Sequence, residues 1–125
     1  MSGLDGKLQS ANLEGFRTVK VIPLVIRYAA GAPSVVQNVT NEDVALTDVG
    51  AGDLTITLAS AGLAPLVVPG IGIVVADANT LSLEANLDGA PTSSVVRIVV
   101  NSGADGATET DPVELHVVIY KLVAG

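Results

Sequence analysis

His116 is the only histidine of the chain, and the sequence contains no cysteine. It lies in the run VELHVVIY (113–120), where the alternation of a β-strand would place it on the same face as Glu114 and Val118. Transition-metal sites usually combine several histidine and cysteine ligands, so one imidazole does not define such a site. We therefore expect a partly buried strand histidine held by a hydrogen bond, and no transition-metal site.

A second group of possible ligands lies in the polar loop between residues 101 and 111. Asp105, Glu109 and Asp111 could offer carboxylate oxygens to a calcium ion. The loop lacks the DxDxDG order of a calcium-binding loop, and acidic loops of this kind are usually solvated. We therefore expect no metal and no cofactor here.

Residues for acid–base or nucleophilic catalysis are not arranged in a recognisable pattern. Two carboxylate pairs occur, Glu42 with Asp43 and Glu109 with Asp111, but glycosidase chemistry requires two acids that face each other across a cleft. No GxSxG motif is present, and the glycines of residues 70–73 (GIGI) are not followed by the lysine of a phosphate-binding loop. The sequence predicts no catalytic or cofactor-binding residue, and we expect the protein not to be an enzyme.

The composition argues against nucleic acid and membranes as partners. The net charge is −7, from 13 acidic and 6 basic residues, and no basic residue lies between Tyr28 and Val96. A nucleic acid would find few cations there to replace its counterions, and one phenylalanine and two tyrosines leave little for base stacking. No apolar run is long enough to span a bilayer. We expect a soluble protein made in the cytoplasm.

The elements that must position these residues are β-strands. The clearest is 53–58, where Leu54, Ile56 and Leu58 alternate with polar residues in the period of a strand with one buried face. No convincing helical period occurs. The pattern predicts an antiparallel β-sandwich or jelly roll of about eight short strands, with an N-terminal arm (1–15) and a single domain (16–125). The expected strands are 16–28, 34–40, 42–49, 53–58, 66–75, 80–87, 93–101 and 112–123.

Three details of these strands can be anticipated. Pro23 cannot donate a ladder hydrogen bond, so its strand should lie at an edge, carry a bulge there or break in two. Asn41 and Glu42 separate two short strands and are expected to form a hairpin tip. Residues 66–75 are interrupted by proline and glycine, which favours two short strands or one bent strand.

Three strands are apolar on both faces: 19–26, 95–100 and 117–123. In an isolated two-sheet sandwich each strand needs only one apolar face. The surplus apolar faces must be covered, and the simplest cover is another copy of the chain. We therefore predict a homo-oligomer, a dimer or a trimer.

Residues 44–58 (VALTDVGAGDLTITL) and 65–68 (PLVV), followed by 112–121 (PVELHVVIYK), resemble a pattern common in small β-modules of tailed-phage virion proteins. In those modules a strand, a glycine-containing turn, a D-[LYF]-T-[IV]-T-L strand and a later P-x-V-V strand precede a closing strand. The resemblance covers most of residues 40–122. The sequence departs from the usual fibre version by having Leu54 where an aromatic residue is frequent, and by its N-terminal arm.

A module of this kind that stands alone at this length resembles a capsid decoration (cement) protein. The resemblance implies a non-enzymatic protein on the outer surface of a virion, made in the host cytoplasm, with the major capsid protein and its own copies as partners. The alternative is a tail-fibre or appendage head that binds a receptor or glycan. The basic residues, which flank the acidic middle, would face an acidic shell. The predicted subunit or capsid contacts are Leu4, Leu8, Leu13, Phe16, Val21, Ile22, Tyr120 and Leu122.

Overall fold

The computed structural model describes residues 17–75, 83–102 and 110–124. Within them the chain forms eight β-strands and no helix, so none of these residues belongs to a helix that could cross a membrane. The strands are β1 (Arg17–Ala29), β2 (Ala32–Asn38), β3 (Val44–Gly50), β4 (Asp53–Leu58), β5 (Val67–Val75), β6 (Leu83–Leu87), β7 (Val95–Ser102) and β8 (Glu114–Ala124).

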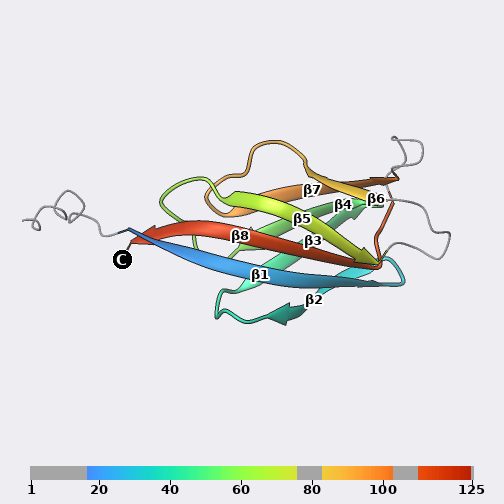
Figure 1. Ribbon diagram of the computed structural model, residues 1–125, viewed down its shortest axis with the longest axis horizontal. Coiled ribbons are helices and arrows are strands. Elements are labelled where there is room, and N and C mark those ends of the chain that lie inside the picture. The colour runs from blue at the N-terminus through green and yellow to red at the C-terminus, as the bar shows by residue number, and fades with distance from the viewer. Residues whose placement is uncertain (1–16, 76–82, 103–109, 125) are drawn as a thin grey trace, which may run out of the picture.

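The strands form two stacked antiparallel sheets (Figure 1). The first has the order β2-β1-β8-β5 and the second has the order β3-β4-β7-β6. The predicted all-β sandwich is therefore confirmed. The predicted arm, residues 1–15, and the start of the strand expected at 80 lie outside the described residues.

Every second residue of the central strands points between the sheets and forms the core. On β4 these are Leu54, Ile56 and Leu58, the three residues whose alternation predicted a half-buried strand. The inner residues of the other central strands are equally buried: Ile22, Leu24, Ile26, Val96, Ile98, Val100, Leu115, Val117 and Ile119. Because these side chains come from both sheets, burial of their apolar surface holds the layers together.

Pro23 occupies a local edge within a central strand. β1 pairs with β8 along its length, but its ladder with β2 begins only at Leu24. Pro23 therefore has a neighbour on one side only, and a bulge between Val25 and Ile26 follows it. The sequence predicted an edge position, a bulge or a break of the strand at Pro23. The structure shows a local edge and a nearby bulge, so the predicted break into two strands is wrong.

The hairpin predicted at Asn41 and Glu42 is also wrong. β2 belongs to the first sheet and β3 to the second, so residues 39–43 cross from one sheet to the other. Of the segment 66–75, residues Val67–Val75 form the single strand β5. Its pairing with β8 shifts twice, which agrees with the bent form of the prediction.

The turn between β1 and β2 carries backbone strain. Ala29 pairs with Ala32, which leaves a two-residue turn in which Ala30 and Gly31 have positive φ values of 53° and 81°. This combination belongs to the type I′ turn, in which asparagine or glycine is preferred at the first position. Alanine there costs about 1–2 kcal/mol through contact of its Cβ with the backbone.

We predict that Ala30→Asn raises the free energy of unfolding by about 0.5–1 kcal/mol, because asparagine tolerates the left-handed conformation. Denaturant titration measures this change. Ala51→Asn is the matched control, since Ala51 is an exposed turn residue without a positive φ. Equal gains in both variants would contradict the explanation by backbone conformation.

Candidate contact surface and the buried charge cluster beneath it

Three of the predicted contact residues lie together on the outer face of the first sheet. Residues that pair across adjacent strands share one face. Val21 and Val67 both pair with Tyr120, and Val19 pairs with Leu122. We call these five residues the apolar face. Val19, Val21, Val67 and Tyr120 are 57%, 46%, 56% and 40% exposed.

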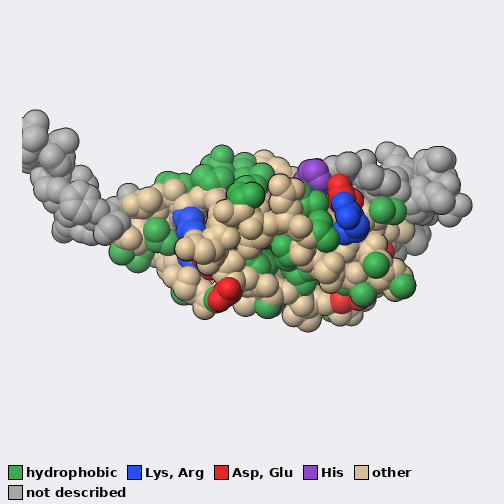
Figure 2. Space-filling model, turned by 90° about the horizontal axis from the view of Figure 1, so that it is seen from below, with side chains coloured by type: hydrophobic (Ala, Val, Ile, Leu, Met, Phe, Trp, Pro, Cys, Tyr) green, Lys and Arg blue, Asp and Glu red, His purple; other side chains and the backbone are tan. Residues whose placement is uncertain are grey.

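The apolar face is hollowed at its end near Arg17 and Ala124. Val19, Val67, Tyr120 and Leu122, together with Ala64 and Pro65, line a shallow hollow of about 210 Å³. Hydrophobic side chains gather along the upper edge of the view in Figure 2, on the side where the histidine lies. The doubly apolar character predicted for β1 and β8 thus leaves apolar side chains in contact with water.

The other predicted contact residues are not on this surface. Ile22 has no exposed area, because it points from β1 into the core, so its assignment as a contact residue is corrected. Leu4, Leu8, Leu13 and Phe16 lie outside the described residues. Val19 and Val67 were not among the predicted contact residues, although Val19 belongs to a strand that is apolar on both faces in the sequence.

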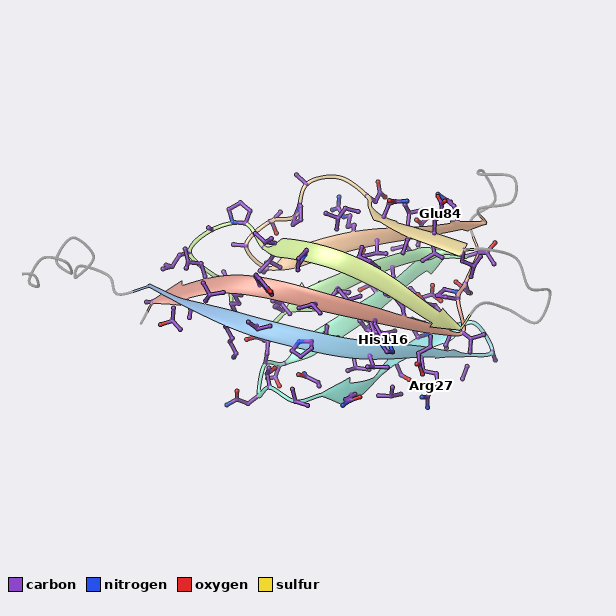
Figure 3. The ribbon with its side chains drawn as sticks, in the orientation of Figure 1. Arg27, Glu84 and His116 are labelled. Atoms are coloured by element: carbon purple, nitrogen blue, oxygen red, sulfur yellow. The ribbon has the colours of Figure 1, made fainter. Side chains whose placement is uncertain are left out.

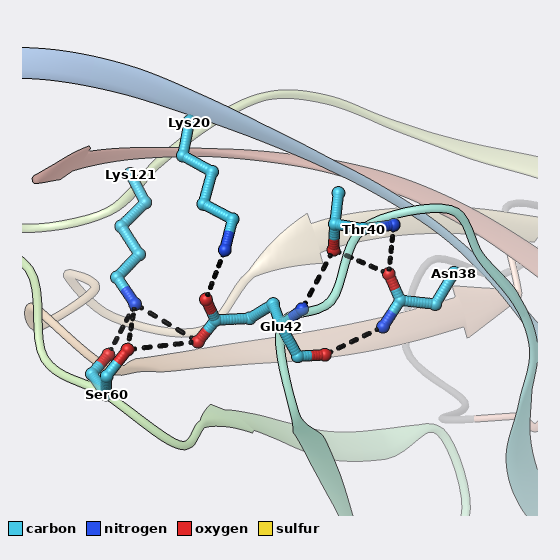
Figure 4. Close-up of polar contacts among 6 residues, drawn as sticks. All are labelled: Lys20, Asn38, Thr40, Glu42, Ser60 and Lys121. Carbon is cyan, nitrogen blue, oxygen red and sulfur yellow. Dashed lines mark hydrogen bonds and ion pairs between the residues drawn. The ribbon is translucent and has the colours of Figure 1, made fainter.

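Directly beneath the apolar face, charged residues replace the hydrophobic core. Lys20 and Lys121 pair across β1 and β8 and both point inward. Glu42, from the crossing between β2 and β3, lies between them, with Oε1 3.1 Å from Lys20 Nζ and Oε2 3.1 Å from Lys121 Nζ (Figure 4). The side chains of Glu42 and Lys121 are only 4% and 1% exposed.

The ammonium group of Lys121 has three acceptors. Besides Glu42, it donates to the carbonyl oxygen of Ser60 at 2.7 Å and to Ser60 Oγ at 2.6 Å. A buried ammonium is tolerated only when it is paired and its hydrogen bonds are satisfied. Ser60 lies in the connection between β4 and β5, so the cluster joins strands of the first sheet to two connections between the sheets.

A network of short-range hydrogen bonds positions Glu42. Asn38 Oδ1 accepts from the backbone N–H of Thr40 at 3.1 Å and from its hydroxyl at 2.8 Å. Asn38 Nδ2 donates to the carbonyl oxygen of Glu42 at 2.9 Å, and the N–H of Glu42 donates to Thr40 Oγ1 at 3.3 Å. This compact turn ends β2 and directs the Glu42 side chain between the sheets.

The electrostatics of the cluster favour the charged form of Glu42. Burial alone would raise its pKa, but hydrogen bonds from Lys121 and Lys20 outweigh burial and hold the pKa below the ordinary value. The short Ser60–Lys121 contact has the spacing of a serine–lysine catalytic pair. A lysine base needs a free lone pair, whereas Lys121 donates to three oxygens. The geometry therefore fits a structural role.

Arg27, Glu114 and His116 form a polar group on the outer side of β1 and β8. Glu114 Oε2 accepts from Arg27 Nη2 at 2.7 Å, and Glu114 Oε1 lies 3.1 Å from His116 Nε2. The hydrogen bonds from Arg27 and His116 lower the pKa of Glu114. The predicted hydrogen bond of the strand histidine is thus confirmed. Figure 3 shows Arg27 and His116 on these neighbouring strands, away from Glu84 on β6.

The described residues contain no group of three histidine, cysteine, aspartate or glutamate side chains that could hold a metal ion. Asp105 and Glu109 of the polar loop lie outside the described residues, so the expectation for that loop is not tested.

The expectation that the basic residues face an acidic shell is wrong for Lys121, which is buried, and Lys20 and Arg27 are engaged with Glu42 and Glu114. The burial of Lys121 could have been predicted from the alternation of β8, in which position 121 faces inward.

Comparisons with protein-family models, with curated proteins and with solved structures find no significant match to this chain. The resemblance to phage virion modules therefore stays a prediction. Inference about function depends on the geometry of the apolar face.

We predict that Glu42→Gln lowers the free energy of unfolding by about 3 kcal/mol at neutral pH, because Lys121 is left buried without a counter-charge. The pKa of Glu42 is lower in the folded state than its ordinary 4.5. Its stabilisation is therefore complete above the unfolded-state pKa and is lost as the pH falls through the folded-state pKa. The difference between wild type and variant should shrink at acidic pH in denaturant titrations.

Asp43→Asn is the matched control, because it removes an exposed carboxylate next to Glu42 without touching the cluster. It should change stability little at any pH. A loss in Glu42→Gln that stays constant down to acidic pH would contradict the assigned ion pairs.

Proposed function

We propose that this protein is a non-enzymatic structural protein of a virion, namely a capsid decoration protein that binds the outer surface of the shell. The observation that carries the proposal is the apolar face. Soluble monomers rarely leave a contiguous apolar patch in water unless it serves an interaction. The five residues of the face lie on three adjacent strands, so they form a continuous surface.

The surroundings of the face favour binding to a protein. Its exposed members are aliphatic side chains and one tyrosine, which are typical of the centre of a protein interface. The buried cluster of Lys20, Glu42 and Lys121 ties the strands beneath the face to the loops around it. A preformed surface of this kind loses little conformational entropy on binding.

The resemblance to phage modules supports the more specific part of the proposal. The strand, turn and strand of residues 44–58 correspond to the β3–β4 hairpin, and the closing segment corresponds to β8. The partners in this proposal are the major capsid protein and further copies of the chain, and the contacts between copies stabilise the shell. Leu4, Leu8, Leu13 and Phe16 stay the predicted contacts of the N-terminal arm.

The proposal predicts that the purified protein co-sediments with shells assembled from the major capsid protein encoded in the same genome. Cryo-electron microscopy of these shells should show added density on the outer surface. Val21→Ser should weaken the decoration by about tenfold, since it removes apolar area from the contact. The readout is the bound fraction as a function of protein concentration.

Val49→Ser is the control, because Val49 is an exposed valine on β3 of the other sheet, and it should bind as the wild type does. Shells that stay undecorated at saturating protein would refute the capsid assignment. Labelling of tails in place of shells would favour the appendage alternative.

A further inference from the structure

Two glycines leave a strip without side chains beside the apolar face. On the edge strand β5, Gly70 pairs with Val118 and Gly72 pairs with His116. Ile71, between them, packs against the core, so Gly70 and Gly72 are consecutive outward positions. The outer surface of β5 is therefore bare backbone at these two positions.

Neither a positive φ nor a steric contact with the described part of the chain requires glycine at these two positions. Gly31, Gly52 and Gly89 have positive φ values, and a Cβ on Gly62 would lie 2.8 Å from the carbonyl oxygen of Leu122. Gly70 and Gly72 have no positive φ. A Cβ on Gly70 would meet no atom within 4 Å, and one on Gly72 would lie 3.9 Å from His116 Cβ.

Glycine inside a strand weakens it and marks a bulge, a bend, or a site where another backbone or a ligand approaches closely. The pairing of β5 with β8 shifts just before Gly70 but not at Gly72. Because both positions face outward and neither has a steric requirement for glycine, together they leave room for an approach from outside the chain. The strip borders Val67 and the outward residues of β8, so the approaching partner would also cover the apolar face.

The register shows which surface fits this strip. In β1, Pro23 pairs with Val118 and Val25 pairs with His116, the same residues that Gly70 and Gly72 face from the other side. Pro23 and Gly70 thus lie at one level of the sheet, and Val25 and Gly72 lie at the next. β1 and β5 flank β8 symmetrically.

A second copy, rotated by half a turn about an axis along β8 in the contact plane, would place β1 of each copy over β5 of the other. Pro23 would then lie over Gly70 of the other copy, and Val25 over its Gly72. The exposed valines at 21 and 67 would meet, since both lie at the level of Tyr120. The contact is self-complementary, as an interface with two-fold symmetry must be.

The ion pairs near this surface limit its charge repulsion. Because the axis follows β8, Glu114 and His116 of the two copies would face each other, and each Glu114 is already paired with Arg27 of its own copy. Between the levels of Val19 and Val25 the outward residues of β1 and β8 are aliphatic residues, Tyr120 and His116. Sheets that pack face to face with nearly aligned strands are a common arrangement.

We infer that the apolar face and the glycine strip form the contact between two copies of this chain. The inference depends on the proposed function in one respect: it names the subunit contact of the proposed decoration protein. In this contact Pro23 and Val25, which are partly buried and line a shallow hollow, would face Gly70 and Gly72 of the other copy.

Sedimentation equilibrium of the full-length chain tests the inference. The wild type should dimerise, and Gly70→Val should weaken dimerisation by about tenfold or more, since the added side chain holds the copies apart. Valine favours strands and has free space here, so the variant should unfold at the same denaturant concentration or a higher one. Gly50→Val, at a strand glycine of the other sheet with equally free space, should dimerise as the wild type does.

Cross-linking gives a second measurement that does not depend on the glycine variant. Because the chain has no cysteine, Val118→Cys introduces a single thiol close to the two-fold axis. A bis-maleimide with a span of about 10 Å, the spacing of stacked sheets, should join two copies. Arg97→Cys, on β7 of the other sheet, is the control and should not be joined.

Several outcomes would overturn the inference. A monomeric or trimeric wild type, unchanged dimerisation of Gly70→Val, or equal cross-linking of both cysteine variants would each do so. A monomeric wild type whose Gly70→Val variant loses binding to shells would instead make the shell protein the occupant. A wild type that dimerises but does not bind shells would refute the proposed function and would leave the inferred dimer contact supported.

Discussion

The antiparallel pairing of β1 with β8 is the interaction on which the rest of the structure depends. It joins the two longest strands from Arg17 to Arg27 and from Glu114 to Ala124. Its inner face supplies half of the central core, and its outer face supplies most of the apolar face. The same register also sets Lys20 opposite Lys121 inside the sandwich. The pairing of β1 with β8 therefore determines the positions of the core residues, of the apolar face and of the buried lysines.

The opposed lysines impose a requirement on the remaining chain. Two like charges on neighbouring inward positions repel each other, and a buried ammonium without a partner is costly. Glu42 resolves both problems by lying between them, and it can do so because the chain after β2 leaves the first sheet at this point. Hydrophobic residues in place of the cluster would give comparable stability. The ion pairs in addition fix the position at which residues 39–43 cross between the sheets.

The sequence predicted the elements well, because a strand with one buried face has a period that is visible residue by residue. Leu54, Ile56 and Leu58 are the clearest case. The sheet to which each strand belongs has no such signal, so residues 39–43 were interpreted as a hairpin when they cross between sheets. Lys121 was treated as a surface charge although it continues the inward alternation of Leu115, Val117 and Ile119. Alternation was the better guide there, because a lysine can be buried when partners exist.

The candidate site was predicted only in part for a related reason. A run apolar on both faces indicates that one face is surplus, but it does not tell which residues face outward. Val21 and Ile22 were therefore both predicted as contact residues, although only Val21 faces outward. Gly70 and Gly72 were interpreted as interruptions of a strand and did not match a phosphate-binding loop. Their outward position beside Val118 and His116 follows only from the register of β5.

The central claim is that the apolar face is covered when the protein works. Tyr120, on the face, and Tyr28, buried in the core, are the two tyrosines of the chain, so Tyr28 is an internal reference for burial. Hydroxyl-radical footprinting read by mass spectrometry can compare their oxidation in the assembled protein and in dilute solution. The account predicts that Tyr120 becomes as protected as Tyr28 on assembly and reactive again on dilution. A Tyr120 that is oxidised equally in both states would contradict it.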